Sequence, residues 1–502
     1  MKLRRSNNNS INSKKIHFGE SPNDVLFMRL AFHTMRKFVT IFSFFKSRKN
    51  FSSSLHRNSP RCSNQLHPNF RNLTQNCDLL LPPLSSHRLF SDIAGNPSTL
   101  NRNLLQDQGI DFPGGRVEFV PEMKFISESV KERVPCYRVL DDNGQPLVGH
   151  NFVQVSKEVA VKMYTDMVTL RSMDTIFYEA QRQGRISFYV TAIGEEAINI
   201  ASAAALSMND VVFPQYREAG VLLWRGFTLQ EFANQLFSNK YDNGKGRQMP
   251  AHYGSKTHNY FTIASTIATQ ISHAVGAAYS LKMDKKDACA VTYFGDGGSS
   301  EGDFHAALNF AAVTEAPVIF ICRNNGWAIS TPISDQFRSD GVVVKGQSYG
   351  VRSIRVDGND ALAIYSAVQA ARQMSITEER PILIEALTYR VGHHTTSDDS
   401  TKYRPASEIE WWRVARDPVA RFRKWLENNG WWNDLAESEL INNLRQQLLH
   451  TIQVAESVEK PPLEEAFRDV YDVPPSNLRE QEQWLKEIVK EQPQEYPPNI
   501  SV

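Results

Sequence analysis

Short apolar runs alternate with helical patterns between residues 289 and 388, and this alternation limits the fold of the chain more than any other feature. The apolar runs are CAVTYF, PVIFICR, SIRVDG and PILIEALTYR, and segments such as DFHAALNFAAVTE lie between them. Strands that alternate with helices at this spacing form a parallel sheet, because each helix returns the chain to the start of the next strand. The sequence therefore predicts an α/β fold in which a doubly wound, mostly parallel sheet has helices on both faces.

The flanking segments predict how the rest of the chain is organised. Residues 157–184 have a helical pattern with one apolar face, and Gly184 suits the end of that helix. The face consists of Val159, Met163, Met167, Leu170 and Met173. Residues beyond about 405 are charged, helical and contain several Trp residues. We predict a leader at 1–95, an N-terminal arm at 96–155, the α/β domain at 156–405 and a helical C-terminal region at 406–502.

Charge is unevenly distributed along the chain. The 502 residues have a formal net charge of +1, which gives no indication of nucleic-acid binding. Residues 1–90 contain fifteen Lys or Arg but three acids, a surplus of twelve, so the remaining residues carry about −11. A basic leader with short apolar stretches is typical of a mitochondrial transit peptide, and a disordered basic tail or a secretory signal are the alternatives. The apolar run at 38–45 is too short to cross a membrane, which takes roughly 20 residues.

The five cysteines indicate a reducing compartment without structural disulfides. Their spacings match no zinc pattern. Cys62 and Cys77 lie in the predicted leader, whereas Cys289 and Cys322 lie in predicted core strands.

A lone acid stands between glycines where the first of these strands ends. Asp296 lies within Gly295-Asp296-Gly297-Gly298, and ligands of parallel sheets bind at the carboxyl ends of the strands. Glycines allow a ligand to approach the backbone, and the amide groups of a helix that opens near Ser300 suit a phosphate. A carboxylate repels a phosphate unless a cation lies between them, and Mg²⁺ accepts oxygen ligands from protein and phosphate together.

A second motif follows the next strand and supplies further oxygen ligands. Asn325 comes 29 residues after Asp296, a separation that one helix, one strand and turns require. If the two strands are neighbours, both side chains emerge at one edge of the sheet, and the Trp327 carbonyl follows in the turn. Each motif alone is a common turn, but the pair at two strand ends predicts a site for a metal ion and a diphosphate.

These two motifs resemble the thiamine diphosphate motif, in which Gly-Asp-Gly is followed after 26 residues by Asn-Asn. Residues from about 110 to 495 resemble the alpha subunit of the decarboxylase component of branched-chain 2-oxoacid dehydrogenases. The pyruvate dehydrogenase alpha subunit usually differs at Ser300-Glu301 and at Arg323. The stretches that carry the resemblance are FPQYREAG, GRQMPAHYG, IATQISHAVGAAY, GDGGSSEGDFHAALNFAA, RNNGWAIST, VDGND and TYRVGHHTTSDDSTKYR.

The resemblance implies roles for particular residues and a thiamine diphosphate-binding fold. His394 matches the active-site histidine beside the cofactor. The implied magnesium ligands are Asp296, Asn325 and the Trp327 carbonyl, where the family usually has Tyr at the third position. A potassium ion is implied at Ser265, Thr269 and Gln270. The implied cofactor contacts are Gln215, Tyr216, Arg217, Ser265, Ile267, Gly297, Gly298, Arg323, Arg390 and His394.

The resemblance also implies a reaction and partners. Such enzymes decarboxylate branched-chain 2-oxo acids in the mitochondrial matrix and transfer the acyl group to a lipoyl arm, in valine, leucine and isoleucine catabolism. A separate beta subunit supplies the glutamate that activates the cofactor, so a tetramer of two alpha and two beta chains on a lipoyl acyltransferase core is implied. A pyruvate dehydrogenase-type alpha subunit and a noncatalytic assembly subunit of the same fold are the alternatives.

Two positions depart from the animal members of the family. Thr395 and Pro405 stand where those members have serines that a kinase phosphorylates, although Ser397 and Ser400 lie nearby. Phosphorylation control at the two family positions is therefore not predicted for this chain.

Overall fold

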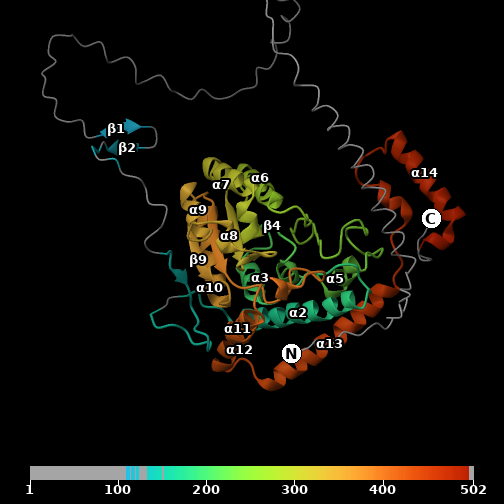
Figure 1. The fold of residues 1–502 in the computed structure, drawn as a ribbon, viewed down its shortest axis with the longest axis horizontal. Coiled ribbons are helices and arrows are strands. Elements are labelled where there is room, and N and C mark those ends of the chain that lie inside the picture. The colour runs from blue at the N-terminus through green and yellow to red at the C-terminus, as the bar shows by residue number, and fades with distance from the viewer. Residues whose placement is uncertain are drawn as a thin grey trace, which may run out of the picture. The chain divides into compact units, whose positions relative to one another are not determined.

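The computed structural model describes residues 109–112, 115–118, 120–121, 123, 133–149 and 152–496; the predicted leader at 1–95 lies outside them. A six-stranded, all-parallel sheet forms the centre of the larger unit, in the order β3-β9-β10-β6-β5-β4. Its strands β4 and β9 are labelled among the helices that surround the sheet in Figure 1. The predicted parallel α/β fold is therefore confirmed. The strands are β3 (Cys136–Tyr137), β4 (Val211–Phe213), β5 (Ala290–Gly295), β6 (Val318–Asn324), β9 (Arg352–Asp357) and β10 (Ile382–Leu387).

Helices cover both faces of this sheet because its strands are apolar on both sides. In β5, Val291 and Tyr293 join one buried cluster, whereas Ala290 and Phe294 join the other. This alternation follows from the strand period of two residues. The first face packs against α3 (Glu196–Ala204) and α10 (Ala361–Thr377), and the second against α6 (Thr269–Met283) and α7 (Gly302–Thr314). Helix α2 (Lys157–Arg182) packs on α3 and belongs to the same buried cluster as the first face.

Helix α2 confirms the helical pattern predicted at 157–184. Its Met163, Met167, Leu170 and Met173 side chains are fully buried, and Val159 is half-buried. The Ser156 side chain caps the first turn, and Gly184 follows the last turn with φ +75°, a conformation that favours glycine. The methionines are thus core residues of the cluster that α2 forms with its neighbouring helices.

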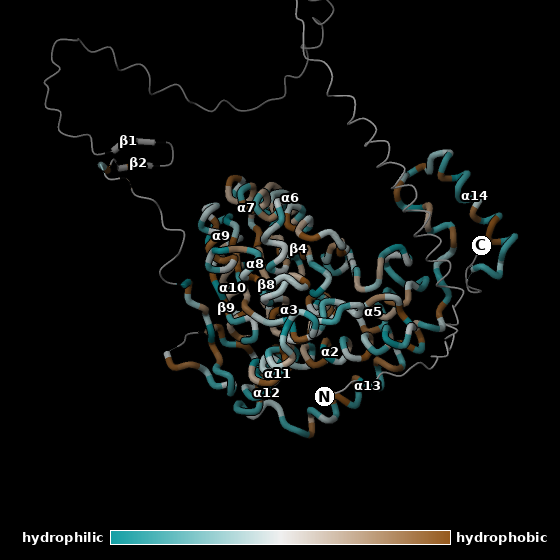
Figure 2. Tube along the Cα trace, viewed as in Figure 1, coloured by the Kyte–Doolittle hydropathy of each residue, from teal (hydrophilic) through white to brown (hydrophobic). Residues whose placement is uncertain are grey.

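The region after residue 405 is helical, as predicted. Helices α12 and α13 pack against α2, and hydrophobic residues alternate with hydrophilic ones along α13 and α14 (Figure 2). Within the described ranges, no helix combines the length and the apolar character needed to cross a membrane. These helices are α11 (Ala406–Ala415), α12 (Pro418–Asn428), α13 (Asp434–Ser457) and α14 (Ser476–Glu491).

Short elements complete the two compact units, which divide between Val120 and Pro121. The first unit contains the antiparallel hairpin of β1 (Gly109–Phe112) and β2 (Gly115–Glu118). The second contains a small hairpin of β7 (Trp327–Ala328) and β8 (Thr331–Pro332). Its other helices are α4 (Ala219–Trp224), α5 (Leu229–Leu236), α8 (Ile333–Gln336) and α9 (Val343–Ser348).

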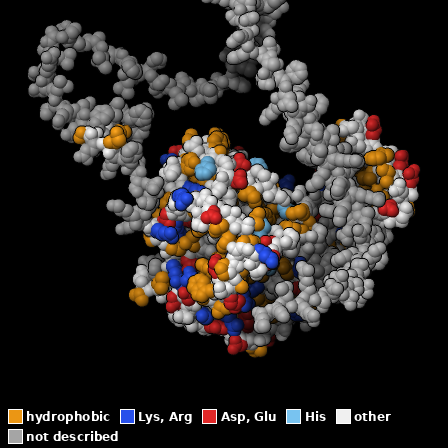
Figure 3. Space-filling model, in the orientation of Figure 1, with side chains coloured by type: hydrophobic (Ala, Val, Ile, Leu, Met, Phe, Trp, Pro, Cys, Tyr) orange, Lys and Arg blue, Asp and Glu red, His pale blue; other side chains and the backbone are white. Residues whose placement is uncertain are grey.

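Charged side chains of both signs are interspersed on the visible face of the second unit (Figure 3). Pairs such as Arg413 with Glu410 are more than half exposed, and exposed ion pairs contribute little to stability. The buried polar contacts therefore matter more for the architecture than the surface pairs do.

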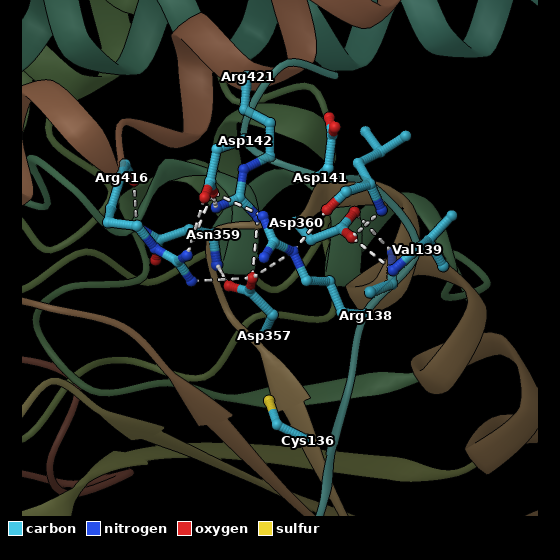
Figure 4. A network of polar contacts seen from close by, with 12 residues as sticks. Cys136, Arg138, Val139, Asp141, Asp142, Asp357, Asn359, Asp360, Arg416 and Arg421 are labelled. Carbon is cyan, nitrogen blue, oxygen red and sulfur yellow. Dashed lines mark hydrogen bonds and ion pairs between the residues drawn. The ribbon is translucent and has the colours of Figure 1, made fainter. Parts of the chain in front are cut away.

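One partly buried network joins residues 138–142 to the end of β9 and to the C-terminal helices (Figure 4). The Asp360 carboxylate accepts hydrogen bonds from the amides of Val139 at 2.7 Å and Leu140 at 2.6 Å. Asp357 forms ion pairs with Arg416 at 3.2 Å and Arg421 at 2.9 Å. The predicted domain boundaries stay predictions, but part of the predicted arm at 96–155 belongs to the central sheet through β3.

We expect Asp360→Ala to lower the free energy of unfolding by about 3 kcal/mol, because it removes a helix cap and orphans two buried amides. The same carboxylate caps α10 through the amides of Leu362 and Ala363, both at 3.1 Å. Asp360→Asn should recover part of the loss, since one oxygen still accepts. Urea unfolding measures the change, with the exposed Glu410→Ala as control. A loss no larger than that of the control would contradict the role of Asp360.

Candidate active site

Loops from the carboxyl ends of β4, β5, β6 and β10 enclose a cavity of about 380 Å³. All residues predicted to contact the cofactor or the magnesium ion line this cavity. A larger cavity of about 640 Å³ lies along 254–262, but its only ionisable side chains are Lys256 and Tyr260. The residues brought together in the smaller cavity are Gln215, Tyr216, Arg217, Ser265, Ile267, Asp296, Gly297, Gly298, Arg323, Asn325, Trp327, Arg390 and His394.

The loop after β5 buries the carboxylate of Asp296. This side chain is 1% exposed, and one of its oxygens accepts a hydrogen bond from Gln336 at 2.6 Å. Burial raises its pKa, although the Gln336 hydrogen bond opposes the rise. A Cβ atom at Gly297 would lie 2.7 Å from the Ala328 side chain, so this close approach requires glycine. The helix expected to open near Ser300 begins at Gly302 instead, because a 3₁₀ turn occupies Asp296–Ser300.

The loop after β6 presents oxygen atoms on the neighbouring strand. Strands β5 and β6 pair directly, with Gly295 opposite Arg323, so the condition that the two strands are neighbours is met. The Asn325 amide donates to Glu195 at 2.8 Å, and its oxygen accepts from the Trp327 amide at 3.3 Å. The Trp327 carbonyl accepts from Arg390 at 3.2 Å and retains a second lone pair.

These oxygen donors fit magnesium. One carboxylate, one amide oxygen and one main-chain carbonyl line the same cavity, and Mg²⁺ is held by few protein ligands together with phosphates and water. No group of three or more His, Cys, Asp or Glu side chains placed for a metal occurs among the described residues. The donor set therefore suits a hard cation that shares its ligands with a phosphate, rather than zinc.

Arg323 is buried at the floor of the cavity between two carboxylates. Its guanidinium lies 3.0 Å from Glu195 and 2.7 Å from Glu218, which are each 1% exposed. Burial lowers the pKa of Arg323, but the attraction of Glu218 and Glu195 outweighs it and raises the pKa overall. Arg323 thus lines the cavity, but the carboxylates of Glu195 and Glu218 largely neutralise its charge.

His394 is held in its neutral form by two arginines. Its Nδ1 lies 3.1 Å from Nη2 of Arg217 and 3.3 Å from Nη1 of Arg390. Guanidinium groups only donate, so Nδ1 accepts and the proton of the neutral ring resides on Nε2. Burial, Arg217 and Arg390 lower the pKa of His394 to about 3. At neutral pH the ring is therefore a hydrogen-bond donor through Nε2.

The loop that carries His394 is anchored at several points. Asp398 accepts from the His394 amide at 2.8 Å and from the Tyr403 hydroxyl at 2.6 Å. Arg390 donates to the same hydroxyl at 2.9 Å. The neighbouring His393 accepts from the Ser400 amide at 3.1 Å, which is a structural contact. Ser400 is buried, whereas Ser397 is exposed.

The three residues predicted to bind potassium each form a hydrogen bond with a different partner. Ser265 bonds His252 at 2.6 Å, Thr269 donates to the Thr266 carbonyl at 3.1 Å, and Gln270 donates to the Tyr293 carbonyl at 2.9 Å. Ser265 lines the cavity, but Thr269 and Gln270 are not among its lining residues.

The sequence interpretation missed four acids and hydroxyls that support the site: Glu195, Glu218, Asp398 and Tyr403. Adjacent acids in GEEAIN, which opens a small-residue helix, were a usable signal for Glu195. Glu218 directly follows Arg217 in QYREAG, where an acid beside a predicted cofactor arginine was another signal.

A family model and several known proteins match most of this chain. The model of the family described as "Dehydrogenase E1 component" matches residues 164–464. The mitochondrial 2-oxoisovalerate dehydrogenase subunit alpha 2 of Arabidopsis thaliana is 73% identical over 393 residues, which are 78% of this chain and 83% of the relative.

More distant relatives have the same description. The mitochondrial 2-oxoisovalerate dehydrogenase subunit alpha of Dictyostelium discoideum is 50% identical over 75% of this chain and 86% of its own length. Its human counterpart is 46% identical over 78% and 88%, respectively. This chain therefore belongs to the dehydrogenase E1 component family, in the branch of the branched-chain 2-oxoacid dehydrogenase alpha subunits.

Proposed function

We propose that this chain is the alpha subunit of a mitochondrial 3-methyl-2-oxobutanoate dehydrogenase, which acts on branched-chain 2-oxo acids with thiamine diphosphate. The observation that carries the proposal is the cavity in which Asp296 and Asn325 meet from neighbouring strands, with His394 beside them. Similarity to the 2-oxoisovalerate dehydrogenase alpha subunits supports the choice of substrate class.

Magnesium would be held by the Asp296 carboxylate, the Asn325 side-chain oxygen and the Trp327 carbonyl. Arg217 and Arg390 line the same cavity and suit the phosphate charge that one Mg²⁺ leaves uncompensated. Gly297 and Gly298 allow the diphosphate to approach the main chain, and Gln215, Tyr216, Ser265 and Ile267 complete the contacts. When bound, thiamine diphosphate supplies the nucleophilic carbon and the electron sink for decarboxylation.

His394 would act on the substrate side of the cavity as a neutral hydrogen-bond donor. Because Arg217 and Arg390 occupy Nδ1, its Nε2 proton is available to an oxygen or sulfur atom of the reacting groups. The two arginines also fix the ring, so the proton is held at one position.

A potassium ion at Ser265, Thr269 and Gln270 rests on the family resemblance alone. The Thr269 hydroxyl and the Gln270 amide donate to main-chain carbonyls, which leaves their oxygens free to accept a cation. The potassium site stays a prediction.

The proposed enzyme includes a second chain. The acids that line the cavity are Asp296 and Glu301, and Glu301 is exposed. We propose that a beta subunit supplies the activating glutamate, in a tetramer of two alpha and two beta chains. This assembly would work on a lipoyl acyltransferase core in the mitochondrial matrix.

The substrate class can be tested directly. With a beta subunit added, we expect turnover of 3-methyl-2-oxobutanoate to exceed turnover of pyruvate at least tenfold, and the alpha chain alone to be inactive. Lipoyl-dependent formation of CO₂ measures both rates. A preference for pyruvate would favour the pyruvate dehydrogenase-type alternative, and loss of thiamine diphosphate binding with Mg²⁺ present would favour a noncatalytic assembly subunit.

Two variants should separate cofactor binding from chemistry. Asp296→Ala removes the only carboxylate among the proposed metal ligands, so thiamine diphosphate binding should weaken at least about 100-fold. His394→Ala should leave binding within about threefold but lower acyl transfer by roughly 10² to 10⁴. Isothermal titration and lipoyl reduction measure the two effects. A fully active Asp296→Ala enzyme would contradict the metal site.

The low pKa of His394 predicts how stability depends on pH. The folded protein keeps the ring neutral down to about pH 3, whereas the unfolded chain protonates it near 6.5, so the unfolded state binds the extra proton in between. The free energy of unfolding therefore falls as pH is lowered through 6.5. Urea unfolding at pH 7.5 and 5 measures this fall. Between these two pH values the free energy of unfolding should fall by about 1 kcal/mol less in His394→Gln than in the natural chain, after discounting for partial exposure. Equal losses would contradict this assignment.

A further inference from the structure

Among the described residues, Glu195 is the buried acid that contacts Asn325 as well as Arg323. It is 1% exposed and precedes α3, on the far side of Asn325 from the Trp327 turn. One oxygen accepts from the Asn325 amide at 2.8 Å, and the other lies 3.0 Å from Arg323. The carboxylate therefore contacts a proposed metal ligand and a buried cation together.

This contact fixes which end of the Asn325 amide faces the cavity. A carboxylate paired with Arg323 only accepts hydrogen bonds, so the NH₂ group of Asn325 must face Glu195. The side-chain oxygen is then directed to the other side, where the Trp327 amide donates to it at 3.3 Å. Without an acceptor at position 195, the amide could present NH₂ to the cavity, and an NH₂ group repels a cation.

Glu195 is itself rigidly held. Gly194 has φ +96°, and a Cβ atom there would lie 2.7 Å from the Tyr389 carbonyl, so only glycine fits before Glu195. The Gly194 carbonyl accepts from Thr388 at 3.0 Å, and Asn359 also contacts Thr388, at 2.6 Å. Asn359 reaches the Arg416 carbonyl of the network in Figure 4. Preorganised support of this kind is what tunes a metal ligand.

We propose that Glu195 is a positioning residue that sets the orientation of the Asn325 amide toward the magnesium ion. The proposal rests on the proposed function, because it takes Asn325 as a metal ligand. Glu195 does not touch the metal in this arrangement. It acts by restricting Asn325 to the one orientation that offers oxygen.

The first test compares Glu195→Ala with Glu196→Ala in the protein reconstituted with a beta subunit. Glu196 is a matched control, because it is adjacent, 0% exposed and paired with a partly buried arginine, Arg171, at 2.8 Å. Both variants should lower the thermal midpoint of unfolding. The Mg²⁺ concentration that half-saturates thiamine diphosphate binding, measured by isothermal titration, should rise roughly 10- to 100-fold in Glu195→Ala alone. Equal shifts in both variants would overturn the proposal.

The second test reverses the donor and the acceptor. Glu195→Gln alone should weaken Mg²⁺ binding less than threefold, because the Gln oxygen still accepts from Asn325. Asn325→Asp places two carboxylates in contact and should weaken Mg²⁺ binding, because neither group can donate to the other. Adding Glu195→Gln supplies the donor from the other side and should then strengthen Mg²⁺ binding at least tenfold. Any effect of Glu195→Gln through Arg323 is common to both backgrounds and cancels in the cycle.

The sign of the Glu195→Gln effect is therefore decisive. Weakening in the natural chain and strengthening in the Asn325→Asp variant supports the positioning role, whereas weakening in both backgrounds overturns it. Asp296→Ala distinguishes the failure of this role from failure of the proposed function. If Mg²⁺ binding survives Asp296→Ala unchanged, the metal site itself is wrong, and the role of Glu195 is overturned with it.

Discussion

A buried guanidinium between two carboxylates ties together the elements that form the cavity. Arg323 lies near the end of β6, Glu195 precedes α3, and Glu218 follows the turn after β4. A charge in such a place is costly unless it is paired and hydrogen-bonded, so the loss of any one of the three side chains would leave an uncompensated buried charge. Gln215 is drawn into the same contact, because Glu218 accepts from its amide at 2.8 Å and its side chain accepts from Gly295 at 2.8 Å. The floor of the site is thus set before any ligand enters.

The arginines that line the cavity above Arg323 are not paired with acids of the described chain, unlike Arg323 itself. Glu195 and Glu218 form ion pairs with Arg323. Arg217 and Arg390 instead donate to carbonyl oxygens and contact His394. Arg217 and Arg390 therefore leave a positive field that lowers the pKa of His394 and suits an anion. Asp296 is the buried acid in this positive field, and burial raises its pKa. A bound cation would lower that pKa again. The charges that line the cavity therefore suit the proposed pair of a cation and a diphosphate better than either ion alone.

The sequence was sufficient for the central strands β5, β6, β9 and β10 and for most of the residues that line the cavity. Short apolar runs such as PVIFICR that alternate with helical patterns indicate buried parallel strands, and turn motifs at their ends can be assigned to one edge once the strands are known to be neighbours. The position of β3 could not be predicted, because two residues carry no periodicity and pair with β9 through a crossover that spans the whole domain. Glu195 and Glu218 were missed for a related reason. Their role depends on contacts with Arg323 across more than 100 residues, which no local pattern encodes.

Arg390 connects the two halves of the proposed chemistry. Its guanidinium donates to the Trp327 carbonyl at 3.2 Å and lies 3.3 Å from Nδ1 of His394. One side chain thus contacts both a proposed metal ligand and the proposed catalytic histidine, and its other terminal nitrogen donates to the Ile329 carbonyl at 2.7 Å and the Tyr403 hydroxyl at 2.9 Å. Because Arg390 cannot move without disturbing both neighbours, the position of the Trp327 carbonyl and the orientation of the His394 imidazole are linked. A lysine could not reproduce this, since a single ammonium lacks the fixed planar fork that reaches all four contacts.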